Sequence, residues 1–335
     1  MSKSYIPNGY KSILNIFDTQ VAIGEIKRIF IANLSRELNL KRVSAPLFVD
    51  PLTGLNDDLS GVERAVTFDI KETGRDVAVV QSLAKWKRMA LHDYKFQDGV
   101  GLYADMNAIR RDEEMDNTHS VYVDQWDWEK IITRADRNIE YLYNTVRSIN
   151  AAMCDTLDEI KLQFPQISTE FAREVFFITS QELEDKYPKL SGKEREDAIC
   201  KEYKTVFISQ IGKTLNSGEK HDGRAPDYDD WSLNGDILLW HEQLNRSLEI
   251  SSMGIRVDST AMDEQLKAAN CDNRRELPFH KMVLNNELPL TMGGGIGQSR
   301  LCMLMLGKVH VGEVQASVWD DDTIRICDEA GVTLL

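Results

Sequence analysis

The stretch Thr291–Leu301, with the sequence TMGGGIGQSRL, carries the strongest chemical signal in the chain. Within this stretch, four of the five residues from Gly293 to Gly297 are glycine, and Arg300 follows three residues after Gly297. Because glycine has no Cβ, such a backbone can lie flat against a planar ligand or approach a phosphate closely. Arg300 would project from the first turn of the next helix, where its planar cation suits a phosphate or an adenine face. Taken alone, the stretch is equally compatible with a glycine-rich turn packed against a strand.

Two better-known phosphate-binding patterns do not fit. The dinucleotide fingerprint needs a third glycine where the chain, counted from Gly293, has Gln298. Gly212-Lys213-Thr214 resembles the end of a Walker A motif, but the first glycine of that motif would fall at Phe207.

Two acids interrupt apolar runs that predict neighbouring strands. Asp236 lies in one run and Glu249 in the next. Buried carboxylates usually pair with an arginine or bind a cation. Arg256 and Ser252 follow on the same predicted strand as Glu249, so an ion pair and a Mg²⁺ site are both open. The Mg²⁺ site is the favoured interpretation.

A long hairpin is predicted from residues 101–109 and 119–127, with Arg110 at its turn. Strand alternation places Gln125 and Asp127 on one face. A half-buried face that carries an amide and a carboxylate needs polar partners. The hairpin therefore favours a site for a polar ligand.

The strand predicted at residues 77–82 leads into a helix that starts with three cations, Lys85, Lys87 and Arg88. The start of a helix normally favours anions. A solvated basic face is the first interpretation of these side chains, and a site for a carboxylate or phosphate is the second.

The elements that must position these residues follow from hydrophobic periodicity. Strands outnumber β–α–β alternations in the second half, which predicts an α+β fold with a mainly antiparallel central sheet flanked by helices. The further elements are helices at 10–38, 128–162, 182–203, 260–269 and 277–285, and strands at 43–49, 174–179, 205–211, 234–240, 248–257 and 312–319.

Three of these segments bear on assembly or on access to a site. The first helix is followed by a strand containing Pro46, a combination compatible with a dimer seam or with a plain edge strand. The polar loop 54–61 contains Asp57, and the long loop 212–234 is a candidate lid.

The composition is that of an ordinary globular protein, with 335 residues, 42% hydrophobic and 28% charged. The net charge of −14 argues against nucleic acid as the main partner. The five cysteines are scattered and form no C-x-x-C pair, as expected for reduced thiols in the cytoplasm. No signal-peptide core is visible, and no apolar run approaches the ~18–20 residues needed to span a membrane.

Seven segments together resemble the type A, ammonia-dependent asparagine synthetase family, whose catalytic fold is that of class II aminoacyl-tRNA synthetases. One departure from the class-wide signature is Ser299, where an acid usually precedes the final arginine. At the hairpin turn Arg111 follows Arg110, and the resemblance favours Arg110 as the phosphate ligand. The segments are DDLSG (57–61), SLAKWKR (82–88), SVYVDQWDWE (120–129), RAPDYDDW (224–231), LNGDIL (233–238), SSMGIRVD (251–258) and GGGIGQSRL (293–301).

The resemblance implies a homodimeric ligase with a single catalytic domain, residues 1–335. Its substrates would be aspartate, ATP and ammonia, with Mg²⁺, and a β-aspartyl-adenylate would release AMP and pyrophosphate. The implied roles are phosphate binding and neutralisation by Arg110 and Arg300; Mg²⁺ binding by Asp236 and Glu249; nucleotide contact by Asp236, Ser252, Gly293 and Gly295; an amino-acid pocket of Ser82, Lys87, Gln125, Asp127 and Arg256; and attraction or deprotonation of ammonium by Asp57 and Asp229.

Three rival functions remain testable. An aspartyl- or asparaginyl-tRNA synthetase is disfavoured by the acidic charge and by the lack of room for a separate anticodon-reading barrel. An inactive paralogue is disfavoured because every charged residue expected for the chemistry is present. A glutamine-dependent synthetase would need an N-terminal cysteine nucleophile, whereas the first cysteine is Cys154.

Overall fold

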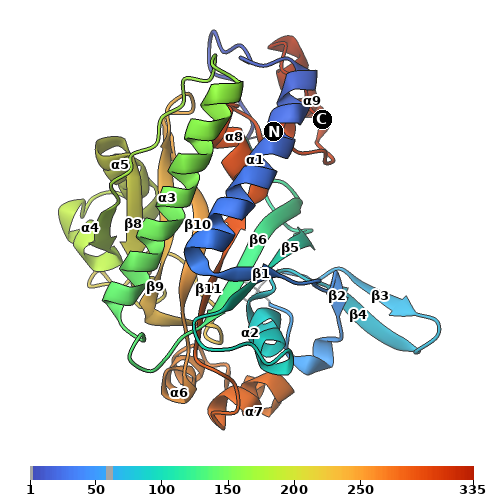
Figure 1. The fold of residues 1–335 in the computed structure, drawn as a ribbon, viewed down its shortest axis with the longest axis vertical. Helices are drawn as coiled ribbons and strands as arrows, with labels where there is room; N and C mark the ends of the chain where they lie inside the picture. The colour runs from blue at the N-terminus through green and yellow to red at the C-terminus, as the bar shows by residue number, and fades with distance from the viewer. Residues whose placement is uncertain (1–2, 58–62) are drawn as a thin grey trace.

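The computed structural model of the protein describes residues 3–57 and 63–335, and an eight-stranded sheet lies at its centre (Figure 1). The strand order is β1-β5-β6-β11-β10-β9-β8-β7. The pairs at the two edges are parallel and those between them are antiparallel, which confirms the predicted α+β class. The strands are β1 (Leu40–Arg42), β5 (Gly101–Ile109), β6 (Tyr122–Ile131), β7 (Phe176–Thr179), β8 (Thr205–Ser209), β9 (Asp229–His241), β10 (Arg246–Arg256) and β11 (Thr291–Gly297).

One face of the sheet is covered by α1 (Ile16–Leu38), α3 (Ile139–Gln163) and α8 (Gln298–Met305). Figure 1 shows α1 and α3 side by side across the strands. Their apolar stripes enclose the largest core cluster, in which the ring centroids of Phe30 and Trp126 lie 4.8 Å apart. Alternation along β6 sends the neighbouring residues Gln125 and Asp127 to the opposite face.

On the opposite face, the sheet contacts the helices α2 (Ala84–Asp93), α4 (Ser180–Lys186) and α5 (Gly192–Tyr203). Leu183 of α4 and Ile199 of α5 pack on Leu238 of β9. Over the middle strands β6, β11 and β10, a cavity remains. The remaining elements are α6 (Ser259–Ala268), η2 (Asp272–Glu276), α7 (Pro278–Leu284), η3 (Val311–Glu313), α9 (Asp321–Glu329), η1 (Pro51–Thr53), and a small sheet of β2 (Phe48–Val49), β4 (Arg75–Val79) and β3 (Thr67–Ile70).

Several predicted boundaries are wrong for local reasons. Helix α1 starts at Ile16, not residue 10, because the Asn15 side chain caps it by accepting from the Asp18 N–H at 2.9 Å. Of the strand predicted at 43–49, only its last two residues form a strand, β2, in the small sheet; β1 of the large sheet already ends at Arg42, and Pro46 lies between the two.

The helix predicted from residue 128 was wrong at its start. Strand β6 continues to Ile131, because Trp128 and Ile131 pair with Gly294 and Thr291 of β11. Helix α3 begins only after its cap, Asn138. The single helix predicted at 182–203 is two helices, α4 and α5, with Pro188 between them.

The strand predicted at 312–319 does not form. Residues Val311–Glu313 make a short 3₁₀ turn instead, and residues 314–320 form no helix or strand before α9 begins. The Glu313 carboxylate accepts hydrogen bonds from the Val309 and His310 N–H groups at 2.9 and 3.1 Å. The apolar pattern reflected burial in the core. The loop predicted at 212–234 is shorter, since β9 already begins at Asp229.

Candidate active site

Four strands bring predicted site residues into one row across the sheet. Asp127 of β6 lies opposite Gly295 of β11, which lies opposite Ser252 of β10. Ser252 in turn lies opposite Asp236 of β9. Directly opposed residues of an antiparallel sheet project to the same side. Residues separated by more than 160 positions are thereby placed on one face.

The glycines of β11 form the floor of this face. Gly293, Gly295 and Gly297 alternate, so the side facing the cavity carries no side chain from β11 there. A Cβ at Gly295 would collide with the Gln125 Oε1 atom. A Cβ at Gly293 would collide with the Glu129 carboxylate and would lie 2.7 Å from Arg256 Nη2. Gly295 thus keeps the floor flat, whereas Gly293 makes room for another side chain.

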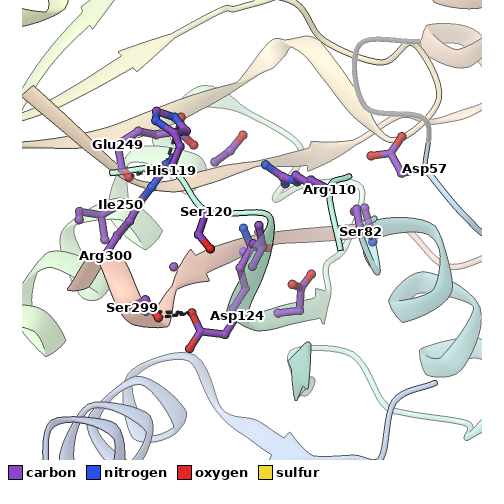
Figure 2. A pocket seen from close by; sticks show the side chains of 18 of the residues that line it. Asp57, Ser82, Arg110, His119, Ser120, Asp124, Glu249, Ile250, Ser299 and Arg300 are labelled. Carbon is purple, nitrogen blue, oxygen red and sulfur yellow. Dashed lines mark hydrogen bonds and ion pairs between the residues drawn. The ribbon is translucent and has the colours of Figure 1, made fainter. Parts of the chain in front are cut away.

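A cavity of about 440 Å³ lies above this floor. In Figure 2, Arg300, Glu249, His119 and Ile250 lie at one end, and Asp57 and Ser82 lie at the other. The cavity brings together most of the predicted site residues. The predicted site residues that line the cavity are Asp57, Ser82, Lys87, Arg110, Gln125, Asp127, Asp229, Glu249, Ser252, Arg256, Gly295 and Arg300. Two predicted residues, Asp236 and Gly293, are not in its lining.

The cations of α2 are buried, so their first interpretation as a solvated face was wrong. Lys87 Nζ pairs with the Asp127 carboxylate and donates to the Gly294 carbonyl at 2.9 Å. Burial lowers the pKa of Lys87, while Asp127 opposes that shift. The second carboxylate oxygen of Asp127, Oδ2, is buried and has no hydrogen-bond partner among the described residues. It is an acceptor aimed at the site beside a buried ammonium group.

Arg256 is held between two carboxylates. Its Nε and Nη2 atoms donate to Glu129 at 3.0 and 2.7 Å, and its Nη1 atom pairs with Asp229. Burial works to lower the pKa of Arg256, but Glu129 and Asp229 together raise it above its ordinary value. Burial raises the pKa of Asp229, and Arg256 limits that rise. The arginine therefore stays charged, and its orientation is fixed.

Glu129 and Tyr228 were not singled out from the sequence. Glu129 follows Gln125 and Asp127 on the same strand face, a period-two signal that the predicted helix start at residue 128 obscured. Tyr228 lines the cavity from the segment just before β9, with its ring 5.8 Å from the Arg256 guanidinium carbon. Burial, with the nearby Asp57 and Asp229, raises the pKa of Tyr228.

Two arginines present charge to the cavity. Arg300 donates to the Thr118 carbonyl at 3.3 Å and to the Glu249 carbonyl at 3.2 Å, and its nearest carboxylate oxygen, on Glu249, is 3.9 Å away. Arg110 Nη1 lies 4.0 Å from Glu113, and Arg110 Nε has no hydrogen-bond partner among the described residues. Both guanidinium groups keep donors for an anion.

Serine stands before Arg300, and its partner explains how the helix start is held. The Asp124 carboxylate accepts from the Ser299 N–H at 3.0 Å and from the Ser299 hydroxyl at 2.6 Å. Lys27 of α1 also reaches Asp124, at 3.2 Å. A carboxylate from β6 therefore caps the first turn of α8 and fixes the position of Arg300.

The two predicted Mg²⁺ ligands differ in their surroundings. Asp236 is buried and forms an ion pair with Arg224, which also pairs with Asp222 at 2.8 Å. Burial raises the pKa of Asp236 to about 7, Arg224 partly offsets the rise, and Glu249 adds to it. The Asp236 Oδ1 atom has no hydrogen-bond partner among the described residues. Glu249 is more exposed and lines the cavity.

The acidic end of the cavity contains Asp57 and Asp229. Asp57 is buried, and its backbone carbonyl accepts from Gln81 Nε2 at 3.0 Å. Ser82 is close to Asp57 at this end (Figure 2), and its hydroxyl accepts from the Ala84 N–H at 3.1 Å. The rest of the predicted loop 54–61, from residue 58 on, lies outside the described residues.

Comparisons with known proteins agree on a single family. A sequence profile described as aspartate-ammonia ligase matches residues 17–331. The aspartate–ammonia ligase of Clostridium perfringens is 57% identical over 336 residues, covering 100% of both chains. That of Clostridium tetani is 59% identical over 331 residues, covering 98% of this chain and 97% of that one.

Solved structures support the fold. Asparaginyl-tRNA synthetase from Pyrococcus horikoshii, complexed with asparaginyl-adenylate, has a TM-score of 0.65 and 14% identity, covering 90% of this chain and 70% of that one. Aspartyl-tRNA synthetase from Entamoeba histolytica has a TM-score of 0.58 and 16% identity, covering 92% and 58%. At these identities the likeness shows the class II synthetase fold and nothing about substrate.

Proposed function

The chain belongs to the aspartate–ammonia ligase family and makes L-asparagine from L-aspartate, ATP and ammonia, and we propose that the cavity over β6, β11 and β10 is its active site. The reaction passes through a β-aspartyl-adenylate and releases AMP and pyrophosphate. The observation that carries the proposal is the buried Asp127 Oδ2 atom, which has no hydrogen-bond partner among the described residues and lies beside Lys87. An acceptor and a cation side by side suit the ammonium and a carboxylate of one amino acid.

Aspartate would occupy the end of the cavity that contains Ser82, Lys87, Gln125 and Asp127. Asp127 would accept hydrogen bonds from the substrate ammonium group. Lys87 and Arg256 would face its carboxylates, and Gln125, whose position Gly295 permits, would add an amide contact. The side-chain carboxyl would then point towards the arginines.

ATP would occupy the other end, with its nucleoside beside Ser252 and the open floor at Gly295. Arg110 and Arg300 would hold the phosphates in line and neutralise the charge that develops during adenylation. The loop that contains Asp222 and Arg224 borders the cavity and an adjoining one of about 380 Å³, which supports its role as a lid.

Ammonia would attack the activated carboxyl from the end of the cavity that contains Asp57 and Asp229. Carboxylates there attract ammonium, and one of them can take the proton that must leave before NH₃ acts as nucleophile. Burial raises the pKa of Asp229 although its ion pair with Arg256 opposes the rise, and a raised pKa suits a carboxylate that takes up a proton.

Mg²⁺ would be held by Asp236 and Glu249 together with phosphate oxygens. Oxygen ligands suit this ion, which commonly uses one or two carboxylates plus the substrate phosphates. Asp236 offers an oxygen without a hydrogen-bond partner, as noted above. Within residues 3–57 and 63–335 there is no group of three acidic, histidine or cysteine side chains arranged for a metal, so ATP would complete the site. The bound ion would offset phosphate charge.

The Mg²⁺ site is tested by Asp236→Asn. The substitution should raise the Mg²⁺ concentration needed for half-maximal rate on the order of tenfold or more. Asp197→Asn, at a carboxylate that binds the Ser247 N–H and hydroxyl outside the cavity lining, is the control. An unaltered Mg²⁺ titration in Asp236→Asn would mean that Asp236 serves only as the partner of Arg224.

The molecule is further proposed to be a cytoplasmic homodimer with one catalytic domain, residues 1–335. The five cysteines form no disulfide, in keeping with a reducing compartment. No helix among the described residues is long and apolar enough to cross a membrane. Leu47, Phe48 and Phe68 are exposed around the small sheet, an apolar surface that a second subunit could cover. Light scattering after size exclusion would measure the mass directly.

The proposed function is tested by product analysis with aspartate, ATP, Mg²⁺ and ammonium. AMP and asparagine should form in equal amounts and only when ammonium is present. A glutamine arm in ammonia-free buffer should give no asparagine. Charging of tRNA with aspartate or asparagine, or no pyrophosphate release at all, would overturn the proposal in favour of a synthetase or an inactive relative.

A further inference from the structure

A buried cluster of charged residues lies next to the cavity without lining it. Its centre is Asp227, whose side chain is fully buried. The Asp227 Oδ2 atom accepts from Lys85 Nζ at 3.0 Å, Arg274 Nη1 at 2.8 Å and His280 Nε2 at 2.9 Å. These donors come from α2, η2 and α7. One carboxylate oxygen therefore joins three separate elements.

The charge of Asp227 is essential to this arrangement. Burial alone would raise its pKa, but Lys85, His280 and Arg274 outweigh burial and lower it below the ordinary value. These three donors therefore favour the ionised form of the carboxylate. Without it, the buried ammonium group of Lys85 would lose its carboxylate ion-pair partner, which is strongly unfavourable.

Two features connect Asp227 to the amino-acid end of the cavity, namely the chain that follows it and its ion pair with Lys85. Asp227 is followed in the chain by Tyr228 and Asp229, which both line the cavity. Lys85 lies two residues before Lys87 in α2. The ion pair between Lys85 and Asp227 therefore fixes the start of the helix from which Lys87 reaches Asp127.

The hydrogen bond to His280 connects Asp227 to the segment before Asp57. His280 lies beneath Gly54, where a Cβ would be 3.3 Å from His280 Nδ1. Gly54 has φ = +74°, so a side chain there would be strained as well as crowded. By contrast, Arg300 and Glu249 are carried by α8 and β10, which contribute no side chain to the contacts of Asp227 given above.

We propose that Asp227 is a positioning residue that aligns the aspartate and ammonia groups of the site, acting through Lys85 on Lys87 and along the chain on Tyr228 and Asp229. The inference rests on the proposed function. The two ends of the cavity should then respond differently to a change at Asp227. Loss of the Asp227 charge should disturb the aspartate end and leave the ATP end intact.

The test is Asp227→Asn, which keeps the shape and removes the charge. The KM for aspartate should rise and kcat should fall, together on the order of 10–100-fold, because small displacements of reacting groups have effects of that size. The KM for ATP should stay within about twofold of wild type. A role in stability alone predicts a lower Tm with both KM values unchanged, and that result would overturn the proposal.

Glu184→Gln is the matched control. Glu184 forms a buried ion pair with Arg195 at 3.2 Å between α4 and α5, and neither lines the cavity. This variant should lose stability without moving either KM. A selective rise in the aspartate KM in the control would show that any broken buried ion pair has this effect, and would contradict the proposal.

A second pair of variants decides the matter if Asp227→Asn does not fold. His280→Gln keeps a donor towards Asp227, whereas His280→Leu removes it. The leucine variant should raise the aspartate KM, and the glutamine variant should restore most of the loss. Equal KM values in both would overturn the inference. Wild-type enzyme that fails to make asparagine would instead refute the proposed function, so the two failures are distinguishable.

Discussion

Arg300 is the single side chain on which the nucleotide end depends most. It faces the cavity with a guanidinium that makes two hydrogen bonds to carbonyl groups and has its nearest carboxylate oxygen 3.9 Å away. Arg300→Ala should therefore lower the rate of adenylation by ~10²–10³-fold, the usual effect of removing a charge partner of the transition state. Aspartate-dependent exchange of pyrophosphate into ATP measures this step.

Arg195→Ala is a suitable comparison, since Arg195 binds Glu184 away from the cavity. It should lower stability while leaving the exchange rate per folded molecule near wild type. If Arg300→Ala retained a wild-type exchange rate, Arg300 would have no part in handling phosphate.

Much of the site at this scale was predictable from residue type and strand alternation. Gln125 and Asp127 were placed on one face by period two alone, and both line the cavity. Glu129 was missed because its strand was predicted to end too early. The pairing of Arg224 with Asp236 could not be predicted, because it depends on how a loop folds back over β9.

At the scale of the element, strand β11 is the part of the site most sensitive to small changes. Gly295→Ala should raise the KM for aspartate about tenfold, because the new methyl group must displace the flexible end of Gln125. The strand itself should still form, since the colliding atom belongs to a side chain. Steady-state kinetics with aspartate and ATP varied separately would measure the effect.

Gly24→Ala provides the opposite outcome for the same substitution. Gly24 is exposed in the interior of α1, and a Cβ there meets nothing within 4 Å. This variant should be more stable by about 0.5–1 kcal/mol, from helix propensity alone, with unchanged kinetics. A wild-type aspartate KM in Gly295→Ala would mean that Gln125, the side chain displaced by the new methyl group, is not in contact with aspartate.

The pattern of elements was predictable where periodicity was long and uninterrupted. The hairpin of β5 and β6, the pair β9 and β10, and the glycine strand followed by α8 all form as expected. Prediction failed at residues 312–319, where the pattern of apolar residues resembled that of a strand but the segment pairs with no strand of the described chain. Boundaries failed where a cap such as Asn15 or Asn138 determined the helix start.

At the scale of the whole molecule, His310 ties the segments near the two termini together. It is fully buried, its Nδ1 accepts from the Gly312 N–H at 3.1 Å, and its Nε2 lies 3.2 Å from the Ser4 hydroxyl. Ser4 also lies 3.1 Å from Thr323 of α9. Figure 1 shows the C-terminus near α9.

His310 should make the fold sensitive to acid. Burial lowers the pKa of His310 to about 4, against facing charges on Asp116 and Asp320 that favour protonation. Between about pH 6.5 and 4 the unfolded chain binds a proton that the folded chain does not, so the free energy of unfolding falls as pH falls, by at most about 3 kcal/mol. Urea unfolding at a series of pH values measures the slope.

His310→Asn keeps an acceptor for Gly312 and removes the titration, so the slope in that window should flatten. A slope in His310→Asn equal to that of wild type would assign the acid sensitivity to other groups.

The ion pairs among the cavity residues also determine how substrate can bind. The two cations at the aspartate end, on Lys87 and Arg256, already have carboxylates of the protein as partners. Aspartate therefore enters an interior that is already neutralised, and its charged groups must share or exchange partners that are in place. The affinity for aspartate then depends on the difference in free energy between the ion pairs before and after binding. Such a difference favours selection of the substrate by its geometry over tight binding. Such an exchange should respond only weakly to ionic strength, unlike the capture of an anion by an unpaired basic surface.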